Sequence, residues 1–130
     1  MQTIVFDVET GPLAESELSA LLPPFDPAEV KTGNIKDPEK VAAKIAEAEA
    51  SHRREFFDKA ALNPMTGKVL AIGIMQGAEF CSVLGPEADL INAFWDLIRN
   101  GGRIIGFNIR QFDLPFLVKR SWHHGIPVPA

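Results

Sequence analysis

The alternation of apolar and polar residues predicts a strand at the start of this chain, followed by helical and irregular segments. Residues 3–8 are rich in β-branched and aromatic side chains, and the consecutive apolar residues Ile4, Val5 and Phe6 predict a central strand that is buried on both faces. A short helix is predicted over 13–22. Three prolines within 23–27 then impose an extended, irregular connection.

The next segment carries the strongest helical pattern. Asp37 is a suitable N-cap, Pro38 suits the first helical position, and the residues that follow to about 62 are rich in Ala, Glu and Lys. Asn63-Pro64 ends this predicted helix. Two apolar runs, 69–75 and 80–84, are separated by Gln76-Gly77 and predict a hairpin of two strands.

The remaining pattern predicts two helices with a strand between them. One helix begins at Gly85-Pro86 and ends at 100–102, the strand covers 103–107, and the last helix covers 111–124 with an early interruption at Pro115. A hairpin followed by helical crossovers indicates an α/β fold with a mixed sheet and helices packed on it. At 130 residues and 46% hydrophobic, the chain fits one domain.

Composition and charge limit where the protein can be located and what it can bind. The longest apolar runs fall far short of the roughly 20 residues that cross a bilayer, and no basic leader precedes Asp7, so we expect a cytoplasmic protein without a membrane partner. The single Cys81 is expected to be a small core residue. The formal charge of −4 argues against a general nucleic-acid-binding surface unless bound cations supply positive charge.

Two clusters of polar residues follow predicted strands. Asp7 and Glu9 are two positions apart, so the pleat of a strand aims both carboxylates at one face. Mg²⁺ prefers such oxygen ligands, whereas capping of a neighbouring helix is the alternative role for these acids. Asn108, Phe112 and Asp113 follow the strand 103–107, at the kind of strand end where open α/β sheets bind their ligands.

These clusters carry a family resemblance. Phe6-Asp7-Val8-Glu9-Thr10-Gly11 resembles the first motif of the DEDD-type 3'-5' exonucleases, and residues 106–113, with Asn108, Phe112 and Asp113, resemble the second. The most similar branch is that of the exonuclease domains of family B DNA polymerases, on the ribonuclease H-like fold. The resemblance covers the layout of the whole chain except a helical insertion at about 23–62.

The resemblance implies a ribonuclease H-like mixed sheet flanked by helices and a two-metal mechanism. Asp7, Glu9 and Asp113 would bind two Mg²⁺ or Mn²⁺ ions and catalyse removal of nucleoside 5'-monophosphates from the 3' end of single-stranded DNA or RNA. Thr10, Gly11, Leu13, Asn108 and Phe112 match positions that contact the terminal nucleotide. Core packing is an equal alternative for Phe112 and the favoured role for Leu13.

The third motif of the family is absent. No Asp or Glu follows Asp113 and the chain has no tyrosine, so the fourth ligand and the water-orienting residue are unassigned, and His123 and His124 are disfavoured replacements. A fragment that lacks the C-terminal strand and helix is favoured over a natural short form or an inactive remnant. An exposed sheet edge would then favour self-association.

Two other functions stay open beside the exonuclease. The first is a catalytically incomplete module that binds nucleic acid or protein, and the second is an endonuclease on the same fold. The predicted helix at 37–62 is equally compatible with covering the substrate groove, binding a partner or lying on the surface.

Overall fold

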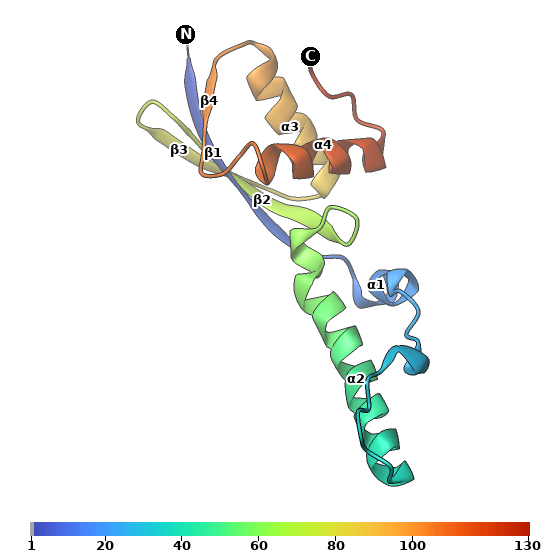
Figure 1. Cartoon of the computed structure of the whole chain (residues 1–130). Helices are drawn as coiled ribbons and strands as arrows, with labels where there is room; N and C mark the ends of the chain where they lie inside the picture. Colours follow the sequence, from blue (N-terminus) through green and yellow to red (C-terminus); the bar gives the residue numbers. More distant parts are fainter. Residues whose placement is uncertain (1) are drawn as a thin grey trace.

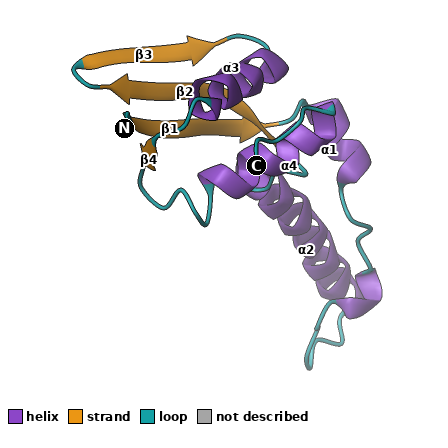
Figure 2. Ribbon diagram, turned by 90° about the horizontal axis from the view of Figure 1, so that it is seen from above, coloured by secondary structure: helices purple, strands orange, loops and turns teal. Residues whose placement is uncertain are grey.

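The computed structural model describes residues 2–130 and contains one mixed sheet with the strand order β3-β2-β1-β4 (Figures 1 and 2). The central strand β1 (Thr3–Pro12) is antiparallel to β2 (Gly67–Gln76) and parallel to β4 (Arg103–Ile105). β2 continues through a tight turn into β3 (Glu79–Leu84). The predicted mixed sheet and hairpin are confirmed.

The helices fall into two groups (Figure 1). α3 (Glu87–Arg99) and α4 (Asp113–His124) pack on the sheet, whereas α1 (Glu15–Leu21) and the long α2 (Pro38–Lys59) extend away from it. Two single-turn 3-10 helices, η1 (Pro27–Glu29) and η2 (Ala60–Leu62), flank α2 in the sequence. Nowhere in residues 2–130 is a helix both long and apolar enough to span a membrane.

The core lies on one face of the sheet only, which corrects the expectation that β1 is buried on both faces. Ile4, Phe6 and Val8 are at most 6% exposed beneath α3 and α4, while Val5 between them is half-buried and faces the other way. The apolar triplet Ile4-Val5-Phe6 was therefore a poor guide to burial, because apolar residues also occur on the exposed face of a sheet. We call the uncovered side the open face.

Three further expectations are wrong. Cys81 is exposed because it lies on β3, at the edge of the sheet, and α3 does not cover it. Pro115 does not interrupt the last helix, since it is the third residue of α4, where the backbone has no intrahelical hydrogen-bond partner for an N–H to lose. The strand predicted to reach Phe107 ends at Ile105.

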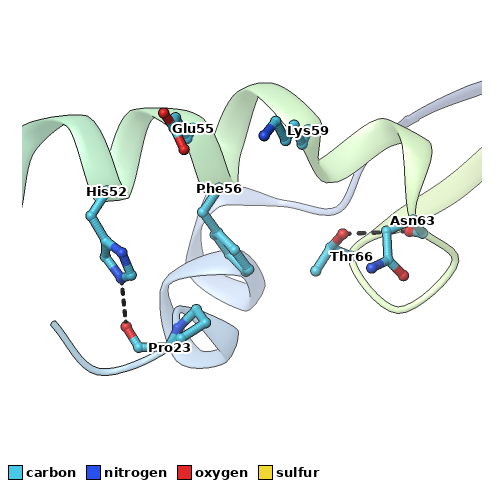
Figure 3. Close-up of a pocket in the computed structure, with 7 residues that line it drawn as sticks. All are labelled: Pro23, His52, Glu55, Phe56, Lys59, Asn63 and Thr66. Atoms are coloured by element: carbon cyan, nitrogen blue, oxygen red, sulfur yellow. Dashed lines mark hydrogen bonds between the residues drawn. The ribbon is translucent and has the colours of Figure 1, made fainter.

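α1, η1 and α2 together form an arm that meets the sheet at its foot, η2. Arg53 of α2 pairs with Glu15 of α1 at 3.6 Å, and the ring of His52 lies 2.9 Å from the carbonyl oxygen of Pro23. A hollow of about 270 Å³ lies at this foot, and the Phe56 ring points into it (Figure 3). No residue of α2 is buried, and the buried Leu18 of α1 lies outside the hydrophobic cluster of the sheet, so the arm contributes little to the core of the domain.

A buried ion pair ties α4 to the rest of the fold. Nη2 of Arg120 lies 2.6 Å from Oε1 of Glu87, the first residue of α3, and the backbone N–H of Val69 donates to the same carboxylate. Nη1 of Arg120 also donates to the carbonyl of Pro64 at 3.2 Å. Burial alone would raise the pKa of Glu87, but hydrogen bonds from Arg120, His124 and Val69 outweigh it and hold that pKa below its ordinary value of 4.5.

Candidate metal and nucleotide site

The first two acids of the expected site share the open face of β1, as their spacing predicted. Asp7 pairs across the ladder with Gly73 and Glu9 with Ala71, so small residues of β2 stand beside both carboxylates. Both acids are exposed and line a single hollow of about 650 Å³. A β-bulge follows directly: Glu9 pairs with Ala71 but Thr10 pairs with Val69, so Leu70 of β2 is the extra residue and the register of the ladder shifts just after the acid pair.

The third acid reaches the same strand from the other end of the sequence. Asp113 is 3% exposed at the start of α4, and its Oδ1 accepts a hydrogen bond of 3.1 Å from the backbone N–H of Val8. β4 pairs with β1 only as far as Val5, so no strand is available to accept from Val8. The Asp113 carboxylate accepts the hydrogen bond that a strand would otherwise accept, and this holds Asp113 beside the acid pair.

Two opposing influences set the charge of Asp113. Burial and, more weakly, the negative charge of Asp7 raise the pKa of Asp113 above its ordinary value of 3.8, while hydrogen bonds from the backbone N–H groups of Val8 and Asp113 itself act against the rise. An ionised Asp7 thus disfavours ionisation of Asp113. A cation bound between them would remove that effect.

The turn between β4 and α4 sets where Asp113 lies. Asn108 has a φ of 54°, and its carbonyl accepts hydrogen bonds from the backbone N–H groups of Gln111 and Phe112. A Cβ at Gly106 would lie 2.7 Å from the carbonyl oxygen of Phe6 and closer still to Ile109, so only glycine fits against β1 there. Asn108 thus shapes this turn through the conformation and the hydrogen bonds of its backbone.

The remaining expected substrate residues lie mostly toward the arm and the core. The hydroxyl of Thr10 donates to the carbonyl of Ala61 at 2.6 Å, and Leu13 donates its N–H to Thr66. Gly11 is buried where an added Cβ would lie 2.6 Å from Leu70. Phe112 is half-buried with its ring centroid 5.6 Å from that of Phe116. None of these four residues lines the hollow that holds Asp7 and Glu9.

Two aromatic residues of the hollow were not singled out by the sequence. Phe80 on β3 is 71% exposed, and Phe107, just after β4, is 92% exposed. They border the acid pair on opposite sides, because β1 lies between β2 and β4 in the sheet. Alternation along the predicted strand 80–84 was the available signal for Phe80. Phe107 lies within the second motif, but nothing in the sequence indicated that its side chain is exposed, because it follows the end of its strand.

Asp7, Glu9 and Asp113 are the type of ligand that a hard cation prefers, but they do not form a complete metal site. No ion pair described within residues 2–130 includes Asp7, Glu9 or Asp113, so carboxylate oxygens are available as ligands. Over the same residues, however, no group of three or more His, Cys, Asp or Glu side chains is arranged closely enough to hold a metal ion. Carboxylates are thus the right type of ligand for a divalent cation, but too few of them lie close together in this structure to hold one.

Comparisons with known proteins point to one family. Residues 62–130, slightly more than half of the chain, match the family described as "Predicted 3'-5' exonuclease related to the exonuclease domain of PolB". This range contains Asp113 but begins after Asp7 and Glu9. The family match therefore does not include the two acids of β1.

One similar protein is the DNA polymerase catalytic subunit of Saimiriine herpesvirus 2 (strain 11), which is 34% identical over 70 residues, covering 51% of this chain and 7% of that polymerase. The structure of the family B DNA polymerase from the hyperthermophilic archaeon Pyrobaculum calidifontis is similar with a TM-score of 0.53 and 15% identity. That similarity covers 98% of this chain and 12% of the polymerase, and it supports the fold. The chain spans only a small part of either relative, and it belongs to the family of predicted 3'-5' exonucleases related to the exonuclease domain of PolB.

Proposed function

We propose that this domain is a metal-dependent 3'-5' exonuclease that removes nucleoside 5'-monophosphates from single-stranded DNA or RNA. The observation that carries the proposal is the convergence of three acids on β1: Asp7 and Glu9 from the strand itself, and Asp113 through its hydrogen bond to Val8. They come from both ends of a chain whose family is that of predicted 3'-5' exonucleases related to the exonuclease domain of PolB. Several carboxylates placed together at one strand are what a metal-dependent hydrolytic site needs.

Asp7, Glu9 and Asp113 are the proposed ligands of Mg²⁺ or Mn²⁺, with two ions in the complete site. When bound, such ions supply activation of a water molecule and stabilisation of the leaving 3' oxygen. The chain itself holds the carboxylates in position, since the bond from Val8 fixes Asp113 and the strand pleat aligns Asp7 with Glu9. The small neighbours Gly73 and Ala71 leave the approach to both acids open.

The terminal nucleotide is proposed to lie in the hollow of the open face. Stacking of an unpaired base on an exposed aromatic ring contributes about 1 to 3 kcal/mol and does not depend on base identity. Phe80 and Phe107 offer such rings beside the acids. Asn108 and Phe112 are proposed to hold the strand end, and contacts from Thr10 and Gly11 would use the backbone, because the Thr10 hydroxyl is already bonded to Ala61.

A binding module is the second candidate. The observation that favours it is that no three-ligand cluster is formed among residues 2–130. In such a module the open face would bind nucleic acid or a protein without cleavage.

The deciding experiment uses a 5'-labelled single-stranded oligonucleotide with Mn²⁺ and a sequencing gel. A ladder that shortens from the 3' end and disappears in Asp7→Ala supports the exonuclease, whereas binding without cleavage supports the module. Mn²⁺ binding measured by electron paramagnetic resonance gives a second readout. We expect Asp7→Asn to weaken it at least tenfold and Asp58→Asn, an exposed acid on α2, to leave it unchanged.

We also propose three points that do not depend on the nuclease activity. The chain is one domain in which the arm is an insertion into the exonuclease fold, its location is cytoplasmic, and copies of it associate through a sheet edge.

A further inference from the structure

We propose that the outer edge of β3 pairs with the same edge of a second copy of this chain, so that two four-stranded sheets join into one. β3 is the last strand in the sheet order, and every residue from Glu79 to Leu84 except Val83 is exposed. This edge carries no proline or lysine and no bulge of the kind that protects the edges of natural sheets. The opposite edge, β4, offers only three residues.

The tight turn decides which backbone groups of β3 are free. Gln76 and Glu79 flank the two-residue turn and pair with each other across the hairpin. In hairpins with such a turn, the two flanking residues form a hydrogen-bonded pair. Bonding to β2 then recurs at every second residue, at 81 and 83. The N–H and C=O groups of Phe80, Ser82 and Leu84 consequently point outward, away from β2, and form a row of hydrogen-bonding groups.

This row is complementary to itself. If two copies meet in antiparallel register with Ser82 opposite Ser82 of the second copy, then Phe80 lies opposite Leu84 and Leu84 opposite Phe80. Every outward N–H and C=O meets a partner, and the aromatic and aliphatic side chains form cross-strand pairs on one face. A two-fold axis perpendicular to the sheet at Ser82 generates the whole arrangement.

Charge and area indicate how stable the pairing is. No charged side chain lies between Phe80 and Leu84, and Glu79 falls beyond the paired segment. Phe80 and Leu84 are 71% and 72% exposed, and a hollow of about 510 Å³ between Cys81 and Leu97 of α3 can accept apolar side chains on the other face. The pair buries on the order of 500 Å², below the roughly 1,200 Å² of stable complexes, so we expect a weak, concentration-dependent dimer.

The proposed dimer has a consequence for the acids and stands independently of the proposed nuclease activity. The perpendicular axis keeps both open faces on the same side of the joined sheet. Five strand spacings separate β1 from β1 of the second copy, which places the two acid pairs about 24 Å apart laterally. Their strands run in opposite directions.

Sedimentation velocity from low micromolar to several hundred micromolar protein tests the pairing. Ser82→Pro removes an outward N–H without removing a bond to β2, and we expect it to weaken dimerisation at least tenfold, while Ser82→Ala, which retains the N–H, dimerises like the parent. Ser82→Glu, which opposes two carboxylates at the axis, gives the same test should the proline variant unfold. A parent that stays monomeric, or proline and glutamate variants that dimerise equally well, would overturn the proposal.

Disulfide formation tests the register. In a Cys81→Ser background, Ser82→Cys places two thiols at a hydrogen-bonded pair with Cα atoms about 5.5 Å apart, within disulfide range, and we expect covalent dimers on mild oxidation. The matched control Glu79→Cys in the same background separates the thiols by about six residues, roughly 20 Å, and should not cross-link. Equal cross-linking of both variants would exclude this register.

Discussion

The covered and open faces of the sheet are built from alternate residues of the same strand, yet they differ in what they hold. On the covered face Phe6 and Val8 pack beneath α3 and α4, whereas on the open face Asp7 and Glu9 line a hollow. A single residue step along β1 thus separates the side that stabilises the fold from the side that carries the acids. We expect substitutions on the two faces to affect different measurements.

The largest expected effect is on the covered face. Phe94 of α3 is fully buried with its ring centroid 4.7 Å from that of Phe6, and Phe94→Ala should lower the free energy of unfolding by about 3 to 5 kcal/mol. The matched control is Phe107→Ala on the open face, where the side chain is 92% exposed and the expected loss is within about 0.5 kcal/mol. Urea unfolding followed by circular dichroism measures both. Equal losses would erase the distinction between the faces.

The buried ion pair comes next. Glu87→Gln leaves the Arg120 guanidinium buried without a carboxylate and should cost about 2 to 4 kcal/mol near neutral pH. Because the pKa of Glu87 is lowered in the folded state, its stabilisation is present above the ordinary value of 4.5 and is lost as pH falls through the folded pKa. Urea unfolding at a series of pH values should therefore show the parent and the variant converging in acid. A constant difference would contradict the assignment.

A smaller effect is expected in the turn that leads to Asp113. Asn108 has a φ of 54°, so Asn108→Ala should cost about 1 to 2 kcal/mol, while Asn108→Gly, which adopts this conformation freely, should cost less than half as much. Thermal unfolding distinguishes the two. If both variants cost the same, the amide side chain rather than the backbone determines the effect.

The smallest expected change in stability, with the opposite sign, is on the open face. The pKa of Asp113 is raised by burial and by Asp7, so ionisation of Asp113 lowers stability as pH rises from 3.8 through its folded pKa. Asp7→Asn removes part of that repulsion and should raise the free energy of unfolding at neutral pH by up to about 1 kcal/mol. Urea unfolding measures the gain, and a ¹³C nuclear magnetic resonance titration should show a lower pKa for Asp113. A destabilised variant would mean that Asp7 has a structural role.

Local patterns predicted the elements well, because caps and periodicity act within a few residues. Asp37 caps α2 through its side chain as expected, and the hairpin turn lies where Gln76-Gly77 indicated. Burial of the two faces of the sheet was harder to predict. Alternation shows that a strand has two faces but not which of them a helix covers. The run of consecutive apolar residues therefore placed Val5 in the core wrongly, and Cys81 was placed there only because it is a single cysteine without a disulfide partner.

The candidate site was predictable in part. The same-face placement of Asp7 and Glu9 follows from the strand pleat alone and is confirmed. The bond between Asp113 and Val8 joins residues 105 positions apart and depends on β4 ending early, which no local signal indicated. The engagement of Thr10 with Ala61 was likewise invisible, because it depends on where the arm returns to the sheet.

The attachment of the arm through η2 has a consequence for how such a domain can diverge. α2 spans 22 residues, about 33 Å, and none of its residues is buried. Whole helical turns can therefore be gained or lost at its far end without shifting the register of β1 against β2, since Thr10 and Thr66 fasten only the near end. Each turn would move the tip by about 5.4 Å. The length of the arm can therefore vary between related domains without moving Asp7 and Glu9 on β1.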